Sequence, residues 1–496
     1  DTAWKGEIPP PPDDVYSAYE YFRAFFDDQM IAILCYQTNL YSTQKNGTCA
    51  NVSPDEMRKY LSILVISGTV RMPHFRMFWQ NGTRFAAVAD LMTRNRFETI
   101  HSCLHMNDNL QAKPRNTDGH DRLFKVRPLV DQLRRNMKIV APEEKQSIDE
   151  QIIPFKGRSH MKQYLKSKPH KWGYKVFTRA SSSGIMHDFI IYEGKGTAKD
   201  HGFGISGDIV CDLVKDLPEH QNYKVFFDNW FTSLRLVEEL KTKGILSVGT
   251  VRADRTEKCP LASDTVLKDL GRGSADFRMD GTTGTEVIKW LDNSSVLLVS
   301  SYAGVEPTDT CKRWSSKEKR SVEVTRPFAV KEYNSFMGGV DLADMLIELY
   351  RTDHKSKKWY MRIFFWIIDV SVVNAWLLYK RHCVQLSIKR KLSLLVFRSQ
   401  VAQALAFVQT KAVKRRSPSA NESGGVSPQE KITRPVTPRP VTDVRFDGVN
   451  HWPQYGDKKN RCKYCTSGYT FLYCGKCKMH LCLLPSRNCF QSFHVK

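Results

Sequence analysis

Three aspartates stand in distinctive stretches of this chain and could together hold divalent cations. Asp149 lies in SIDEQIIPFKGR, Asp228 in YKVFFDNWFTS and Asp341 in YNSFMGGVDLADM. Carboxylate oxygens are the ligands that Mg²⁺ prefers, and a pair of such ions can activate the attacking oxygen and stabilise the leaving oxygen of an in-line phosphoryl transfer. A single aspartate is more often a surface or capping residue. The prediction of a catalytic, Mg²⁺-binding site therefore depends on all three carboxylates reaching one point.

A fourth acid, Asp344, follows Asp341 by three residues, so the two share one face if this stretch is a helix. Asp344 could be a fourth ligand, a carboxylate that supports the ligands, or a capping acid. We group it with the predicted catalytic residues and leave its role among these three open.

A second metal signal lies near the end of the chain, where six cysteines and His494 fall within 33 residues. Two CxxC pairs are typical of the knuckles that clamp tetrahedral Zn²⁺, and closed Cys/His sites of this kind are structural. Two ions need eight ligands, and His451 and His480 compete for the eighth place. We favour His451, because ligands at both 480 and 482 would be spaced unusually for a knuckle. The predicted ligands of two Zn²⁺ ions are His451, Cys462, Cys465, Cys474, Cys477, Cys482, Cys489 and His494.

The net charge of +23 is distributed unevenly along the chain. The last 146 residues carry +20 of it, which predicts a polyanionic partner. A basic run at the head of a predicted helix could clamp DNA phosphates, although a solvated basic face gives the same pattern. The predicted DNA-contacting residues are Lys355, Lys357, Lys358 and Arg362.

The elements that would position the aspartates follow the order β-β-β-α-β-α-β, with a helix further on. This is the order of an RNase H-like catalytic core of the retroviral-integrase type. We therefore predict a multidomain α+β fold that combines this core with an inserted β-rich subdomain, a flanking helical domain and a C-terminal cross-brace zinc finger. The predicted segments are a first helical part (14–143), the first part of the core (144–252), the β-rich insertion (253–325), the last part of the core (326–350), a second helical part (351–410), a disordered linker (411–444) and the Cys/His-rich module (445–496).

The most apolar stretch, residues 361–379, is predicted to be a buried helix, because Arg362 and Asp369 would be costly inside a membrane. We therefore expect no membrane partner.

Seven cysteines are scattered over the first 383 residues, which favours a reducing compartment. KRRSP at 414–418 resembles a short nuclear localisation motif. The chain begins with Asp1, so we expect further residues before it.

The stretches IDEQIIPFKGR, FFDNWFTS and MGGVDLADM, in this order and followed by the Cys/His module, resemble the piggyBac transposase family over residues 19–494. The resemblance implies that Asp149, Asp228 and Asp341 bind Mg²⁺ in an RNase H-like domain, and that Asp344 is a further essential acid. It also implies a cut-and-paste reaction. The enzyme nicks the transposon end, and the freed 3′-OH attacks the opposite strand to form a hairpin. Hairpin opening and joining into TTAA follow. The helical segments would dimerise and bind DNA, and the Cys/His module would recognise terminal repeats.

Two functions are compatible with these features. The first is a working DNA transposase, a DDD-type polynucleotidyl transferase that acts as a homodimer on double-stranded DNA in the nucleus. The second is a domesticated, sequence-specific DNA-binding protein that binds terminal-repeat relics without cutting them. We favour the first, because all three aspartates are present.

Overall fold

The computed structural model describes residues 2–166, 168–316, 318–407, 445–465 and 467–495. Two compact units make up the chain, residues 1–409 and residues 410–496. The predicted linker 411–444 and the KRRSP motif lie outside the described residues.

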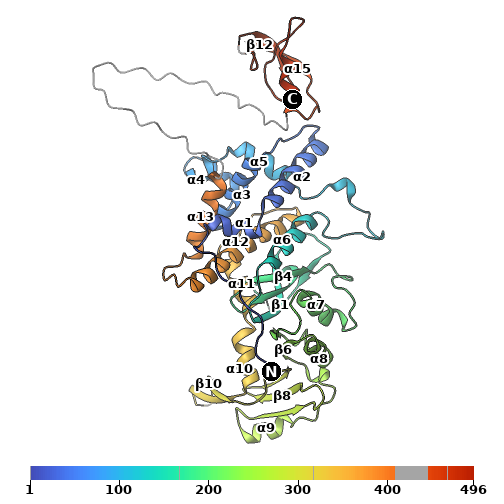
Figure 1. The fold of residues 1–496 in the computed structure, drawn as a ribbon, viewed down its shortest axis with the longest axis vertical. Helices are drawn as coiled ribbons and strands as arrows, with labels where there is room; N and C mark the ends of the chain where they lie inside the picture. The colour runs from blue at the N-terminus through green and yellow to red at the C-terminus, as the bar shows by residue number, and fades with distance from the viewer. Residues whose placement is uncertain (1, 167, 317, 408–444, 466, 496) are drawn as a thin grey trace, which may run out of the picture. The chain divides into compact units, whose positions relative to one another are not determined.

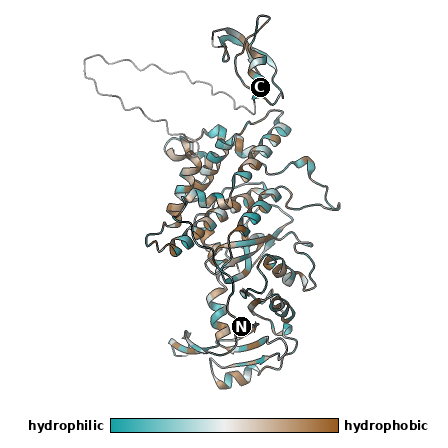
Figure 2. Cartoon of the chain, viewed as in Figure 1, coloured by the Kyte–Doolittle hydropathy of each residue, from teal (hydrophilic) through white to brown (hydrophobic). Residues whose placement is uncertain are grey.

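Helices of the larger unit share one hydrophobic core. Their sequences explain this, because each helix presents an apolar side; α6, for example, buries Leu129, Leu133 and Met137. Figure 2 shows hydrophilic and hydrophobic residues intermixed along most of these helices, as expected for helices buried on one face. Local signals also set helix ends, since Ser53 and Glu56 form a capping box at the start of α3. The helices are α1 (Ala18–Phe25), α2 (Asp28–Asn46), α3 (Pro54–Thr69), α4 (Ala86–Ala89), α5 (Arg94–Cys103), α6 (Arg127–Ile139), α12 (Trp359–Gln385) and α13 (Leu394–Phe407), with 3-10 turns η1 (Phe75–Trp79) and η2 (Asn109–Gln111).

The helix α12 runs through this core and is buried along most of its length. Among the described residues it is the one helix that is long and apolar enough to cross a membrane. Its polar groups are paired inside the protein. Asp369 Oδ1 accepts a hydrogen bond from Arg398 of α13 at 2.9 Å, and Asn374 bonds the backbone N–H and C=O of Met186. Paired polar groups within an apolar helix are typical of a protein interior, so the prediction of a buried helix is confirmed.

A nine-stranded mixed sheet forms the other main part of the larger unit. The strands run in the order β2-β3-β1-β5-β6-β9-β8-β7, with β4 also paired to β3. Figure 1 shows α7 and α8 beside these strands. The strands are β1 (Lys145–Pro154), β2 (Lys162–Tyr164), β3 (Trp172–Ser181), β4 (Met186–Ile191), β5 (Tyr223–Phe227), β6 (Ile245–Thr250), β7 (Ala275–Met279), β8 (Glu286–Leu291) and β9 (Ser295–Ser300). The helices and turn along this part of the chain are α7 (Gly204–Val214), α8 (Leu234–Thr242), η3 (Ala253–Arg255), α9 (Asp264–Leu270), α10 (Phe328–Phe336) and α11 (Gly339–Leu349).

The first part of the sheet has the predicted order of elements, with the short strand β2 added between the first two predicted strands. β1 is antiparallel to β3 and parallel to β5, and β5 is parallel to β6. Residues 253–325 were predicted to form an inserted β-rich subdomain. Three of its strands instead continue the same sheet, because β9 pairs antiparallel with β6. Only the strands β10 (Asp309–Ser315) and β11 (Arg320–Arg326), within the described part of this segment, form a separate hairpin.

In the described residues of the smaller unit, 445–465 and 467–495, two hairpins and the short helix α15 surround a small core. Six cysteines contribute to that core, together with Leu481 and Phe493. A core so small needs additional cross-links to be stable, such as bound metal. Its elements are β12 (Pro453–Arg461), β13 (Tyr469–Cys474), β14 (Leu483–Leu484), β15 (Arg487–Asn488) and α15 (Cys489–His494).

Candidate functional site

Asp149 and Asp228 lie side by side where two parallel strands end their pairing. The register pairs Ile148 of β1 with Phe227 of β5, and this is the last pair of that ladder. Asp149 directly follows Ile148, and Asp228 directly follows Phe227. β5 ends at this point, whereas β1 continues to Pro154 in its pairing with β3, and α/β proteins place their ligands beyond the carboxyl ends of parallel strands such as β5. The structure therefore brings these two predicted residues together.

Glu150 joins them, although it was not predicted. One carboxylate oxygen from each of Asp149, Glu150 and Asp228 lies within 4.8 Å of the others. Backbone amides orient two of the three, since Glu150 N–H donates to Asp149 Oδ1 at 2.7 Å and Trp230 N–H donates to Asp228 Oδ1 at 2.9 Å. The position of Glu150 directly after Asp149 gave no signal, because neighbouring residues on a strand are expected to face opposite sides of the sheet.

Asp341 stands at the start of α11, beside this cluster rather than within it. Gly339 allows α11 to approach the sheet, because a Cβ at that position would lie 2.3 Å from the carbonyl oxygen of Ser181. The Ser147 hydroxyl then accepts a hydrogen bond from Val340 N–H at 3.2 Å. Asp341 itself is exposed, and its Oδ1 lies 3.3 Å from the amine of Lys168. In this structure the carboxylates of Asp149 and Asp228 lie together and that of Asp341 lies beside them, so a metal site shared by all three aspartates stays a prediction.

Asp344 is half-buried on the same helix and lines a pocket of about 620 Å³ with Asp341, Lys168, His170 and Glu348. Its position agrees with the prediction that Asp341 and Asp344 share one face of a helix. The pocket is lined by both acids and bases, so it could receive a polar ligand beside the acid cluster.

Burial raises the pKa of several of these carboxyl groups. It raises the pKa of Asp149 to about 7, although the neighbouring Lys168 acts in the opposite direction. Burial also raises the pKa of Asp228 and brings the pKa of Asp344 to about 6. Acids gathered in a poorly solvated place resist ionisation unless a cation is close. Carboxyl groups perturbed in this way are typical of functional sites.

The donor set fits a hard divalent cation such as Mg²⁺. It consists of carboxylate oxygens, which such ions prefer. Glu150 Oε2 is buried and has no hydrogen-bond partner among the residues that the structure describes. A buried oxygen of this kind is unfavourable without a partner, and a bound cation at this cluster would provide one. Asp149, Glu150 and Asp228 are the residues that would hold it.

The predicted zinc ligands gather into two groups of four in the smaller unit. Within each group, one ligand atom from every residue lies within 4.8 Å of the others. The groups alternate along the chain, which is the cross-brace arrangement that we predicted. The first group is His451, Cys474, Cys477 and His494, and the second is Cys462, Cys465, Cys482 and Cys489.

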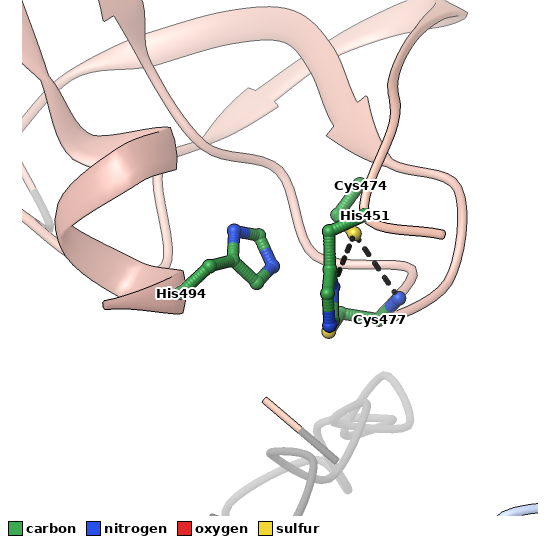
Figure 3. Close-up of side chains that lie close together, drawn as sticks. All are labelled: His451, Cys474, Cys477 and His494. Carbon is green, nitrogen blue, oxygen red and sulfur yellow. Dashed lines mark hydrogen bonds between the residues drawn. The ribbon is translucent and has the colours of Figure 1, made fainter. Parts of the chain in front are cut away.

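His451, and not His480, completes the first group, which Figure 3 shows. His451 Nδ1 lies 3.4 Å from Cys474 Sγ and 3.5 Å from Cys477 Sγ. Its other ring nitrogen lies 3.0 Å from Asp447 Oδ1, and a carboxylate on the far nitrogen is how metal-binding histidines are commonly oriented. His480 instead bonds Asn460 at 2.9 Å through Nε2.

The remaining ligands also have the chemistry of a zinc site. His494 Nδ1 donates to the carbonyl of Phe490 at 2.8 Å, and its buried Nε2 has no hydrogen-bond partner in the described chain. A hydrogen bond between Cys474 and Cys477 lowers the pKa of Cys474 to about 4 and raises the pKa of Cys477. A backbone hydrogen bond from Gly468 lowers the pKa of Cys465 to about 6. Thiolates are the form that binds Zn²⁺, so these groups fit that ion.

The predicted DNA-contacting residues lie at the head of α12 in different surroundings. Lys355 and Lys357 are exposed and line a pocket of about 1110 Å³. Arg362 pairs with Asp353, and the Lys358 amine donates to the carbonyl of Ser102 at 2.8 Å. Two of the four cations are therefore free to face solvent, and contact with DNA stays a prediction for all of them.

Residues 17–376 match a family model described as Transposase IS4. PiggyBac transposable element-derived protein 3 of Homo sapiens is 35% identical over 486 residues, which cover 96% of this chain and 77% of that protein. PiggyBac transposable element-derived protein 2 of Homo sapiens is 33% identical over 452 residues, covering 90% and 72%. Among solved structures, a cryo-EM structure of the piggyBac transposase synaptic complex with hairpin DNA aligns with a TM-score of 0.67 at 22% identity, covering 96% of this chain and 99% of that one. At this identity the last comparison shows a shared fold.

Proposed function

This chain belongs to the piggyBac family of transposases, and on that premise we propose that it is a DNA transposase that cuts and rejoins DNA by phosphoryl transfer. The observation that carries the proposal is the cluster of Asp149, Glu150 and Asp228, which lies where the parallel pairing of β1 and β5 ends, within β1 and directly after β5. A carboxylate cluster of this kind serves reactions that need a divalent cation. No such chemistry is required of a protein that only binds DNA.

We propose that the first part of the sheet is an RNase H-like core. Three successive antiparallel strands, β1, β3 and β4, are followed by β5 and β6 in parallel, each reached through a helix. This order supports the assignment. It delivers Asp149 from the first strand and Asp228 from the end of β5, while α11 carries Asp341 and Asp344 to the same side.

Mg²⁺ bound at this cluster would activate the attacking oxygen and stabilise the leaving one. The chain's own residues prepare the site. Backbone amides fix the carboxylates of Asp149 and Asp228 before any ligand arrives, so little reorganisation is needed at the moment of reaction. Asp341 is exposed and lines the neighbouring pocket, so its side chain can turn toward a ligand.

We further propose that the substrate is double-stranded DNA, namely transposon ends and a TTAA target, and that cleavage proceeds through a hairpin. A related fold was solved as a synaptic complex with hairpin DNA, which supports this. The chain would act as a homodimer in the nucleus, with Lys355 and Lys357 on DNA phosphates. Two Zn²⁺ ions would stabilise the Cys/His module, which would read terminal repeats.

An excision assay in cells tests the proposal. A reporter carries the element's own ends flanked by TTAA, and the chain is compared with Asp228→Asn and with Asp254→Asn, an exposed aspartate that serves as the control. We expect the chain and the control to excise the reporter and Asp228→Asn to lose at least about 100-fold, because a transition-state interaction is removed. DNA binding in a gel shift should be retained in all three.

The opposite outcome favours the second function. If neither the chain nor the control excises the reporter while both bind the same ends in the gel shift, the protein is a domesticated DNA-binding protein. Excision that survives in Asp228→Asn contradicts the assignment of the catalytic site.

A further inference from the structure

One lysine connects the acid cluster to α11. Lys168 lies in the loop between β2 and β3, and its side chain is 16% exposed. Its Nζ donates a hydrogen bond to Asp341 Oδ1 at 3.3 Å and lies 3.8 Å from Asp149 Oδ2. The ammonium group therefore stands between two of the aspartates that were predicted to share a metal.

We propose that Lys168 is a positioning residue whose ammonium holds the place of a divalent cation between Asp149 and Asp341 until the cation displaces it. The inference rests on the proposed function, since it assumes that the carboxylates receive a metal ion. It goes further by assigning a competitor for that site within the chain itself.

The geometry explains why Asp341 stands apart from the acid cluster. An ammonium can neutralise two carboxylates, but it also separates them, because each oxygen contacts the nitrogen on a different side. While Lys168 remains, Asp341 pairs with the amine and does not join Asp149, Glu150 and Asp228. Once the amine leaves, Asp341 would be an unpaired acid beside the cluster and a natural further ligand.

A second lysine near the acids does not share this role. The Lys175 amine lies 4.5 Å from the ring centroid of Trp230 and 4.7 Å from that of Phe177. It forms no ion pair within the residues that the structure describes. Aromatic faces therefore hold this cation, and Lys168 is the one described lysine that bonds the predicted metal ligands.

The exchange needs movement of only one side chain. The loop is closed by a backbone hydrogen bond from Leu165 N–H to the Lys171 carbonyl at 2.8 Å. A second contact to α11 joins His170 Nε2 and Glu348 Oε1 at 3.2 Å. Both can stay while the Lys168 amine withdraws into the adjoining pocket of about 620 Å³, which Lys168 itself lines.

The test measures binding of Mn²⁺ alone, without DNA, by isothermal titration at pH 8. Lys168→Gln is compared with Lys171→Gln, which removes the same charge from an exposed position in the same loop. We expect Lys168→Gln to bind Mn²⁺ about three- to tenfold more tightly than the control, because the ion no longer competes with an ion pair of ordinary strength. Lys168→Arg keeps a cation in place and should bind close to the unmodified chain.

Thermal unfolding in buffer without added divalent cations provides a second readout. Without metal, Lys168→Gln should melt at a lower temperature than Lys171→Gln, because its carboxylates repel one another without a counter-ion. Saturating Mn²⁺ should remove that difference.

Equal Mn²⁺ affinities in Lys168→Gln and Lys171→Gln, or a metal-free melting temperature that does not change, would overturn the inference and leave the proposed function intact. If glutamine prevents folding, Lys168→Met is tested against the same control with the same expected results. If Mn²⁺ binding does not depend on Asp228 in any variant, the proposed function itself is wrong, and the inference is overturned with it.

Discussion

At the scale of single residues, the structure adds Glu150 to the candidate metal ligands. Glu150→Gln keeps the size of the side chain and removes its charge, so the cluster would lose one of its three carboxylates. We expect Mn²⁺ affinity to fall by roughly 10- to 100-fold, the range found when groups around a metal are changed. Titration beside Glu219→Gln, an exposed control, checks this; equal affinities would show that Glu150 lies outside the metal site.

The pattern of residues could not predict Glu150, because neighbours on a strand are expected to face opposite sides of the sheet. The reason for the exception is local. Pairing of β1 with β5 ends at Ile148, so the β1 edge that faces β5 is open beyond that residue and the Glu150 carboxylate can reach Asp228. Asp149 and Asp228 were predictable, since each is an acid in a stretch with a clear strand pattern, Asp149 within β1 and Asp228 directly after β5. The contacts of Lys168 were not predictable, because a loop sequence does not show which other side chains a loop residue contacts.

Protonation of Asp149 sets the expected pH dependence of metal binding. Burial raises the pKa of this group to about 7 in the metal-free protein, so the carboxyl is protonated below pH 7 and ionised above it. A metal ion needs the ionised form. We therefore expect Mn²⁺ affinity to be constant above about pH 8 and to fall by up to tenfold per unit below pH 7. Calorimetry in two buffers of different ionisation enthalpy should detect proton release at pH 6.5 and little at pH 8.5; a flat profile would contradict the assignment of Asp149.

At the scale of elements, the order of strands and helices in the core was predictable because each has a clear period and a terminator. The position of the strands of residues 253–325 in the sheet was not predictable. Their strands read as a separate β-rich piece, but β9 pairs with β6 and extends the sheet. The strands β6 and β9 lie about 50 residues apart in the sequence. Hydrophobic periodicity identifies each strand, but it does not show which strand pairs with it. Four of the zinc ligands were predictable because CxxC spacing fixes them locally, and the other four lie among the cysteines and histidines near those pairs.

The two zinc groups lead to a prediction about the smaller unit. His451→Ala removes one ligand from the first group, whereas His480→Ala removes a histidine that bonds Asn460 outside both groups. Zinc content of the purified chain should fall from two ions toward one for His451→Ala and stay at two for His480→Ala. Elemental analysis by mass spectrometry measures this directly. Unchanged zinc in His451→Ala, or a loss in His480→Ala, would reverse the assignment of the eighth ligand.

Disruption of the second group should destabilise the smaller unit without unfolding the larger one. Cys462→Ser disrupts the second group, and the small core depends on its metal. The larger unit has separate hydrophobic cores, so it should keep its own melting transition. Limited proteolysis that cuts only near the end of the chain would match this expectation. Loss of the melting transitions of both units would contradict it.

At the scale of the whole molecule, the uneven charge predicts how DNA binding responds to salt. The chain carries +23, with +20 in the last 146 residues, and each phosphate contact releases counter-ions. With six or more contacts, affinity should fall by roughly 10³-fold between 50 and 200 mM salt.

Replacing both Lys355 and Lys357 with glutamine should lower the slope of log affinity against log salt by about two. The same double change at Lys312 and Lys319, two exposed lysines of the β10–β11 hairpin, should leave the slope unchanged. A slope that is shallow in the unmodified chain would mean that the charge serves a purpose other than DNA binding, and equal slopes in both double variants would remove Lys355 and Lys357 from the DNA contact.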